Sequence, residues 1–342
     1  KEKNYLESSA SAMFGYALAR GVREGYLPER YMKVATTGWA GIKKEFIKTN
    51  TQGQTDWEGT VSVSGLGGNP YRDGSYDYYM SEKLRTNDAK GLGPAIRAAL
   101  EIEAYEKGWP AKGKTVLLDD YFNHEIRRGK LGTDEVWHYK YNEQLDSGFS
   151  IFMNTFRTMG GKVGQLSTAP TEANLANASV YIIVDPDTEK ETANPQFVGP
   201  NNVKAISEWV KKGGVLALFG NDGQNAELDK FNTLSETFGI KFNKDRKFEV
   251  LNNDYRMGRV MIPAGNSIFP NTKEIYIKEV STLSLSKDAK PVLTVNGDVL
   301  IAMAKYGKGS VFVIGDPWLY NEYTDGRRLP ADGDRGIAGV CV

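Results

Sequence analysis

Three short runs of apolar residues in the middle of the chain place the strongest constraint on its fold. They are TVLL at Thr115–Leu118, VYIIV at Val180–Val184 and VLALF at Val215–Phe219. Runs of this length, bounded by polar segments, are typical of strands buried on both faces. Helix candidates lie between them at about 146–158 and 201–212, and the second ends in a basic turn followed by two glycines. Strands that alternate with helices predict a mainly parallel sheet with helices on its faces.

The last third of the chain is rich in predicted strands. Candidates lie at Val292–Val295, Val299–Lys305 and Ser310–Ile314, and they are joined by the turn sequences NGD and YGKG. Both links suit hairpin turns. We therefore expect a domain over residues 109–332 that combines the parallel sheet with a β-rich C-terminal part. The remaining residues, 333–342, have no clear element, and we expect an atypical tail there.

The first 108 residues have a helical pattern instead. Apolar residues recur at helical spacing over 8–25, 28–48 and 91–108, and the link GYLPE suits an antiparallel pair of helices. A short strand is expected at Trp57–Ser64. Trp109 begins the predicted boundary between the domains, so residues 1–108 form the first domain, an all-helical unit with one long loop. The first of these segments has Ala10, Met13, Phe14, Ala17, Leu18 and Val22 at helical spacing, and the second has an apolar stripe of Tyr31, Val34, Ala35, Ile42 and Phe46.

The composition excludes several classes of function. The sequence has 43 Lys and Arg against 43 Asp and Glu, so no net charge favours nucleic acid or an anionic membrane as a partner. No apolar run approaches the roughly 18 residues of a transmembrane helix. The single cysteine, Cys341, rules out disulfides, cysteine-rich zinc sites and a cysteine nucleophile in the body of the chain. The two histidines, His124 and His138, cannot build a histidine-rich metal site, so we expect neither a metal nor a cofactor.

The loop that precedes the third helix has residue types that suit a sugar. Tyr71, Tyr76, Tyr78 and Tyr79 lie close together and follow the glycine-rich run SGLGG. Phenol rings stack on pyranose rings and donate hydrogen bonds to hydroxyl or carboxylate groups. Glycines let the backbone turn tightly and approach a ligand. The alternative is an ordered loop that packs on helix ends, with the tyrosines partly in the core, and the pattern leaves both open.

Polar residues follow each of the predicted strands. His124 lies among carboxylates in Asp119–Glu125, and carboxyl ends of parallel strands are where ligands bind. It could act as an acid or base, but we favour a polar loop with a hydrogen-bonded histidine, and we favour the same for His138. An amidotransferase-like fold would place a cysteine nucleophile near Phe219–Gly223, and none occurs there, so we expect this domain to be non-catalytic. Asp316 and the two residues after it are expected to form a strand-end turn.

Residues 5–106 resemble the C-terminal part of the unsaturated glycuronyl hydrolases, glycoside hydrolase families 88 and 105. The resemblance is carried by the runs LESSASAMFGYALARGVREGYL, GTVSVSGLGGNPYRDGSYDYYMSE and NDAKGLGPAIRAALE, in order and spacing. Residues 109–332 resemble a domain appended to some family 105 proteins of Bacteroidetes, with a flavodoxin- or glutamine-amidotransferase-like core. Its matching runs are VLLDDYFNHE, WHYKYNEQLDSGFS and GKGSVFVIGDPWLYNEYTDGR.

The resemblance implies an (α/α) six-hairpin barrel, of which residues 1–108 would supply about the last two hairpins. Family members remove a Δ4,5-unsaturated uronic acid from oligosaccharides: an Asp protonates C4, water adds at C5, and the resulting hemiketal opens and releases the aglycone. That Asp lies in the early half of the family's barrel, so we expect it upstream of Lys1. The resemblance also implies a substrate rim that includes Ser8, Tyr71, Tyr76, Tyr78 and Tyr79.

Two interpretations of function remain open at this point. The first is a glycoside hydrolase whose partner is an unsaturated uronic-acid oligosaccharide. The alternative is a non-catalytic fragment with a carbohydrate-binding or structural role. No targeting signal is visible and the sequence starts at Lys1 rather than Met, so the sequence does not determine the cellular compartment. The usual location of family members favours the periplasm or the extracellular space.

Overall fold

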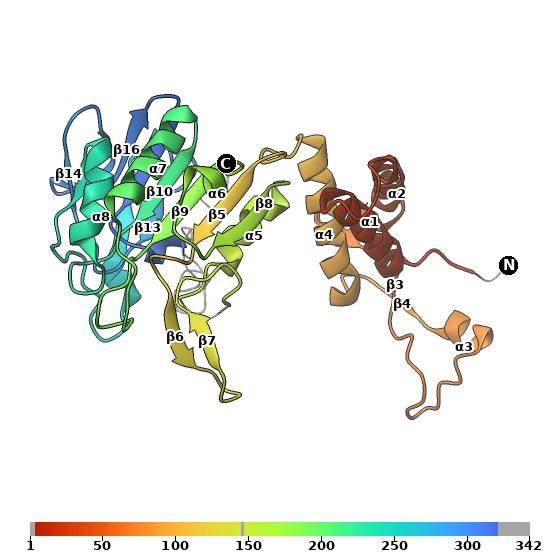
Figure 1. Ribbon diagram of the computed structural model, residues 1–342. Coiled ribbons are helices and arrows are strands. Elements are labelled where there is room, and N and C mark those ends of the chain that lie inside the picture. Colours follow the sequence, from red (N-terminus) through yellow and green to blue (C-terminus); the bar gives the residue numbers. More distant parts are fainter. Residues whose placement is uncertain (1–3, 145–146, 321–342) are drawn as a thin grey trace. The chain divides into compact units, whose positions relative to one another are not determined.

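A computed structural model describes residues 4–144 and 147–320 (Figure 1). The chain divides into two compact units. Unit 1 comprises Lys1–Lys112 with Thr158–Gly160, and unit 2 comprises Gly113–Arg157 with Gly161–Val342. The tail predicted at 333–342, with its cysteine, lies outside the described residues.

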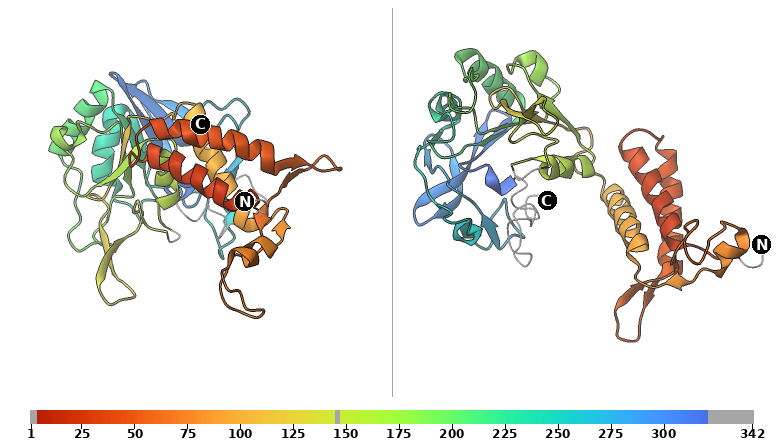
Figure 2. Two further views of the ribbon diagram at one scale, coloured as in Figure 1. Left: turned by 90° about the vertical axis from the view of Figure 1, so that its right-hand side faces the viewer. Right: turned by 90° about the horizontal axis from the view of Figure 1, so that it is seen from below.

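Unit 1 is built on three long helices that pack side by side (Figures 1 and 2). They are α1 (Ser8–Arg23), α2 (Arg30–Phe46) and α4 (Ala89–Glu106), which confirms the three predicted helices. A bidentate ion pair ties α1 to α4, since the guanidinium of Arg23 donates to both carboxylate oxygens of Glu101 at 2.7 and 2.9 Å. Both side chains are buried.

The prediction of an all-helical unit is wrong in its connections. Two-stranded sheets join the helices: β1 (Ile47–Thr49) pairs with β2 (Thr55–Trp57), and β3 (Thr60–Val61) pairs with β4 (Leu84–Arg85). The second helix was predicted to reach residue 48, but the backbone becomes extended at Ile47, and a turn with Gly53 at φ 78° closes the hairpin. A short helix, α3 (Tyr76–Ser81), lies in the long loop between β3 and β4.

Most of the apolar residues at helical spacing in α1 do not form its packed face. Small residues make that face, among them Ala12, Gly15 and Ala19, while Met13 and Phe14 are exposed. A Cβ built on Gly15 would already be in contact with Ile42 of α2 and Ala98 of α4. The neighbouring helices approach so closely that only small side chains fit between them, and hydrophobicity therefore does not identify the packed face here.

Unit 2 contains one nine-stranded sheet. Its parallel part has the order β8-β5-β9-β10-β17, and antiparallel strands extend it beyond β17. The predicted strands at 115–118, 180–184 and 215–219 and the two C-terminal hairpins are confirmed. The parallel strands are β5 (Thr115–Asp119), β8 (Lys162–Leu166), β9 (Val180–Val184), β10 (Val215–Phe219) and β17 (Gly309–Ile314), and the extension comprises β11 (Ile240–Phe242), β14 (Leu283–Leu285), β15 (Lys290–Val295) and β16 (Asp298–Tyr306).

Helices and loops bury both faces of this sheet (Figure 1). On one face pack α6 (Glu172–Leu175), α7 (Pro200–Lys212) and α8 (Leu228–Ser235), and on the other packs α5 (Ser150–Thr158). The helix predicted from residue 146 starts at Ser150 among the described residues. Two hairpins complete the unit, β6 (Glu125–Arg128) with β7 (Asp134–Trp137) and β12 (Arg259–Met261) with β13 (Glu274–Tyr276).

The strand order creates a topological switch point at one edge of the sheet. From β5 the chain passes to β8 on one side and then returns to β9 on the other side of β5. The loops that follow β5 and β9 therefore diverge at the carboxyl-terminal edge. In open α/β sheets this topological switch point is where ligands bind.

Candidate functional site

The glycine–tyrosine loop of unit 1 runs from β3 to α3. The backbone of Gly67 pairs with that of Arg72, and Gly67 and Gly68 adopt φ values of 69° and 85° that favour glycine. Ser75 caps α3 by accepting a hydrogen bond from Tyr78 N at 3.1 Å. Asp73 Oδ1 in turn accepts from Ser75 N at 2.8 Å, and these bonds lower the pKa of Asp73. The loop is thus held by local hydrogen bonds at its glycine turn and at the start of α3.

The four tyrosines of this loop differ in exposure. Tyr71 is 80% exposed and Tyr76 is 41% exposed, whereas Tyr78 and Tyr79 are half-buried. The ring of Tyr79 stacks on Tyr5 with 5.6 Å between centroids and 20° between planes. The structure therefore combines the two alternatives left by the sequence: two tyrosines pack inward and two offer their rings to solvent.

Ser8 lies apart from the tyrosine rings. It is fully buried, and its hydroxyl group lies 2.8 Å from Thr60 Oγ1. Its backbone N–H donates to Gly59 O at 2.9 Å, and Trp57 Nε1 donates to Thr60 Oγ1 at 3.2 Å. Ser8 thus fixes the start of β3, the strand that leads into the loop, and does not itself reach the surface of the loop.

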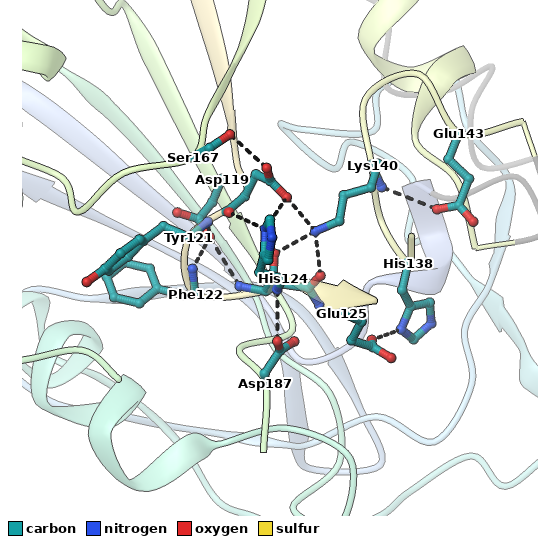
Figure 3. Close-up of polar contacts among 12 residues, drawn as sticks. Asp119, Tyr121, Phe122, His124, Glu125, His138, Lys140, Glu143, Ser167 and Asp187 are labelled. Carbon is teal, nitrogen blue, oxygen red and sulfur yellow. Dashed lines mark hydrogen bonds and ion pairs between the residues drawn. The ribbon is translucent and has the colours of Figure 1, made fainter. Parts of the chain in front are cut away.

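A second cluster of polar side chains lies at the carboxyl end of β5 in unit 2 (Figure 3). The strand ends in Asp119, whose Oδ2 accepts from the backbone N–H groups of Tyr121 and Phe122 at 3.1 and 2.8 Å. Its Oδ1 accepts from the hydroxyl group of Tyr181 on β9. Burial raises the pKa of Asp119 to about 6 despite these bonds. Asp119 therefore shapes the turn that presents the next residues.

Asp120 is the centre of the cluster. Its Oδ1 lies 2.9 Å from Nζ of Lys140, and its Oδ2 accepts from Ser167 Oγ at 2.7 Å. Burial acts to raise the pKa of Asp120, but the ammonium of Lys140 and the hydrogen bonds outweigh it, and the pKa is lowered. Lys140 also donates to the carbonyl and the side-chain oxygen of Asn123. Its three ammonium protons thus have three acceptors, so the charge is paired although the side chain is buried.

His124 is held at both its backbone and its ring. Its N–H donates to Asp187 Oδ2 at 2.8 Å, and its Nδ1 lies 3.2 Å from Asp120 Oδ1 and 3.1 Å from the Asp120 carbonyl. Both neighbours of Nδ1 are acceptors, because the pKa of Asp120 is lowered and its carboxyl group is ionised. Nδ1 therefore carries the proton, and in the neutral ring Nε2 is left as an acceptor.

The loop after β9 contributes two further buried carboxyl groups, Asp185 and Asp187. Asn123 donates to the carbonyl of Asp185 at 2.8 Å, and Asn221 donates to its Oδ2 at 3.2 Å. Within the described residues, Oδ1 of Asp185 and Oδ1 of Asp187 are buried and have no hydrogen-bond partner. Burial raises the pKa of both groups, and the nearby carboxyl groups of Glu125 and Glu191 add to the shift at Asp185.

His138 makes a separate pair at the base of the β6–β7 hairpin. Its Nδ1 hydrogen-bonds Glu125, and its ring stacks between Trp137 and Tyr139. This agrees with the predicted hydrogen-bonded histidine. Asp316 forms the expected strand-end turn, since its carboxyl oxygens accept from the backbone N–H groups of Lys278 and Trp318.

The sequence pointed to Asp119–Glu125 but missed the partners that complete the cluster. Asp185 and Asp187 directly follow a buried strand, which is the same signal that marked Asp119, so they could have been found. Lys140 and Ser167 carried no such signal, because tertiary contacts alone bring them to Asp120. Within the part of the chain that the structure describes, no group of His, Cys, Asp and Glu side chains is arranged to hold a metal ion. Likewise, no helix there has the length and hydropathy needed to cross a membrane.

Comparison with known proteins relates the two parts of the chain to different proteins. Residues 1–106 match the family model for Glycosyl Hydrolase Family 88. A protein of Agrobacterium fabrum is 42% identical over 104 residues, which are 29% of this chain and 45% of that protein. The chain thus spans less than half the length of this curated relative.

Two solved structures are also similar. A glycoside hydrolase from family 105 of C. acetobutylicum is 45% identical over 30% of this chain and 29% of its own, with a TM-score of 0.29. The mmIFT52 N-terminal domain is 15% identical over 66% of this chain and 93% of its own, with a TM-score of 0.50. The alignment with the mmIFT52 domain is longer than unit 1, so it includes residues of unit 2. At 15% identity this similarity concerns the fold alone. The sequence similarity of residues 1–106 relates this part of the chain to the glycoside hydrolases.

Proposed function

We propose that the chain is part of an unsaturated glycuronyl hydrolase of the family 88 and 105 type. Its substrate would be an oligosaccharide that carries a Δ4,5-unsaturated uronic acid at its non-reducing end. The match of residues 1–106 to the family model is the observation that carries this proposal. In the proposed arrangement, residues 1–108 are the last part of an (α/α) barrel, and residues 109–332 are an accessory domain with a flavodoxin- or amidotransferase-like core.

The surface of unit 1 supports the place of its helices in a larger barrel. Met13 and Phe14 on α1 are exposed, as are Ile96 and Leu100 on α4. These side chains lie on helices whose other faces are already packed against each other. A barrel would cover such apolar faces with further helices.

Unit 1 would contribute one wall of the sugar site. Tyr71 and Tyr76 would meet the sugar, Tyr78 and Tyr79 would support them, and Ser8 would act indirectly by fixing β3. The acid that protonates C4 needs a pKa raised toward neutrality. Asp73 in this loop has a lowered pKa, which does not suit that role. We infer, as the family resemblance implies, that the catalytic Asp is supplied by sequence upstream of Lys1.

The exposed rings of Tyr71 and Tyr76 also fit the alternative for the isolated chain, which is carbohydrate binding without hydrolysis. In that case residues 1–342 bind the unsaturated oligosaccharide through the tyrosine loop but do not convert it. The parent protein, with the residues that supply the acid, would carry out the reaction.

Loss of near-ultraviolet absorbance from the C4=C5 bond tests hydrolysis directly. With an unsaturated uronyl disaccharide, we expect no bleaching by this chain and saturable binding in titration calorimetry. Tyr71→Ala should weaken that binding about tenfold, as expected for the loss of one stacked ring with its hydrogen bond. Tyr26→Ala is the matched control, because Tyr26 is 81% exposed and lies outside the loop.

Each outcome of these measurements is informative. Bleaching by this chain would refute the placement of the catalytic Asp outside it. Equal binding by Tyr71→Ala and the Tyr26→Ala control would refute the tyrosine rim. Absence of any binding or bleaching, also by the parent protein, would overturn the assignment to this type of hydrolase.

A further inference from the structure

The cluster in unit 2 presents one imidazole to solvent with unusual support. The side chain of His124 is 40% exposed, although its backbone and its Nδ1 are both fixed by buried carboxyl groups. Among the described residues no hydrogen bond reaches its Nε2. A fixed Nδ1–H with a free, outward Nε2 is the arrangement by which proteins orient a histidine toward a ligand.

The supporting groups are costly to bury. Asp120 and Lys140 are each only 3% exposed, and taking two charges out of water is favourable only when their hydrogen bonds are satisfied. Here they are satisfied: Asp120 is bonded by Lys140, Ser167 and His124. A turn that only connected β5 to β6 would need no buried ion pair behind an exposed ring. The network therefore holds the ring of His124 in one orientation.

The location agrees with this interpretation. His124 lies in the loop after β5, and the Asp187 that holds its backbone lies in the loop after β9. These two loops flank the topological switch point, and ligands bind there in open α/β sheets. The cluster thus combines a position suited to ligands with a side chain that is fixed and accessible.

The free ring nitrogen of His124 indicates the class of ligand. Nε2 of His124 is without a donor among the described residues, and the side chain is 40% exposed. A complementary ligand must bring an O–H or N–H group to this nitrogen. The carboxylate of Asp120 beside the ring is already paired with the ammonium group of Lys140 at 2.9 Å, so it does not attract a second cation. A hydroxyl-rich ligand therefore fits better than an ammonium ion.

We propose that the carboxyl-terminal edge of the parallel sheet in unit 2 binds a saccharide, with Nε2 of His124 accepting a hydrogen bond from a ligand hydroxyl group. The bound sugar would lie against the loops after β5 and β9. This site is independent of the tyrosine loop and of the hydrolase proposed for residues 1–108. It would give the accessory domain a carbohydrate contact of its own.

Imidazole NMR signals of the full chain test this proposal, because the sequence contains only two histidines. The His124→Gln variant identifies the signal of His124, and that signal also reports whether Nδ1 carries the proton. D-glucose, L-rhamnose and sodium D-glucuronate are titrated separately to roughly 100 mM, which saturates a site with a Kd of ~10 mM. Ethylammonium chloride is titrated in the same way.

We expect at least one sugar to shift the His124 signal saturably and to leave the His138 signal in place. Calorimetry should show about tenfold weaker binding by His124→Gln, as expected for the loss of one hydrogen bond, and unchanged binding by the control His138→Gln. The proposal is overturned if no sugar shifts His124, if His124→Gln binds as tightly as the wild type, or if only ethylammonium binds. If a variant does not fold, the wild-type titration decides by itself. None of these results depends on hydrolysis of an unsaturated uronide.

Discussion

Gly91 and Gly93 lie two residues apart in α4 and should respond oppositely to the same substitution. Gly91 is buried, and a Cβ at this position would lie 2.1 Å from Thr60 Oγ1 and 2.4 Å from Trp57 Nε1. Gly93 is exposed, and a Cβ there would meet no atom within 4 Å. Both residues are within the helix, so the gain from replacing glycine with alanine is the same for both.

The contacts of Gly91 set the size of the effect. Overpacking costs about 1–3 kcal/mol. Moving Thr60 also breaks its buried hydrogen bonds with Ser8 and Trp57, and a buried polar group without a partner costs about 1–3 kcal/mol. Alanine in a helix returns about 0.5–1 kcal/mol. We expect Gly91→Ala to destabilise unit 1 by about 2–4 kcal/mol and Gly93→Ala to stabilise it by about 0.5–1 kcal/mol.

Hydrogen exchange of the α4 amides in the full chain measures this difference, because it reports unit 1 separately from unit 2. Gly91→Ala should lower the free energy of opening of α4, and Gly93→Ala should raise it. The reasoning fails if Gly91→Ala leaves protection unchanged. It also fails if the two variants lose protection equally, since this would show that helix propensity or exposure, and not the contact with Thr60, decides the outcome.

Two further predictions concern unit 2. Lys140→Met should destabilise unit 2 by about 3–5 kcal/mol in urea denaturation, because the buried carboxylate of Asp120 loses its cation. The double variant Asp120→Asn/Lys140→Met should recover part of this loss. A loss below about 1 kcal/mol in Lys140→Met would contradict the paired network. Burial raises the pKa of Asp316 from 3.8 to about 7 in the folded state. Protonated Asp316 therefore contributes its full stabilisation below pH 3.8, and this contribution is lost as the pH rises through about 7. Asp316→Asn should therefore show a smaller fall in the free energy of unfolding between roughly pH 4 and pH 8 than the wild type, and an equal or larger fall would refute the raised pKa.

Local sequence patterns predicted β5, β9, β10 and the C-terminal hairpins of unit 2. VYIIV and VLALF form β9 and β10, as is typical of continuous apolar runs of this length, which suit a strand covered on both faces. Asn296 and Gly297 adopt φ values of 52° and 90°, which is the turn that their residue types favour. In these segments the local preference and the tertiary fold agree.

The packed face of α1 shows where such patterns fail. Hydrophobicity favoured Met13 and Phe14, but the contacts with α2 and α4 selected Ala12, Gly15 and Ala19. Close helix packing requires small residues, and a hydrophobic stripe does not reveal how near a neighbour will come. The same limit applies to Ser8, which the family resemblance placed at a rim and the structure places under β3.

The sequence by itself determined the three long helices of unit 1, the strands β5, β9 and β10 with the C-terminal hairpins of unit 2, the relation of residues 1–106 to glycoside hydrolases, and the position of His124 after a strand. Those properties depend on residues near one another in the chain. The tertiary structure alone decided what surrounds His124. Its partners come from distant segments: Asp187 is 63 positions away, and Ser167 lies 47 positions from Asp120. Only the pairing of β5 with β8 and β9 brings those segments to one edge of the sheet.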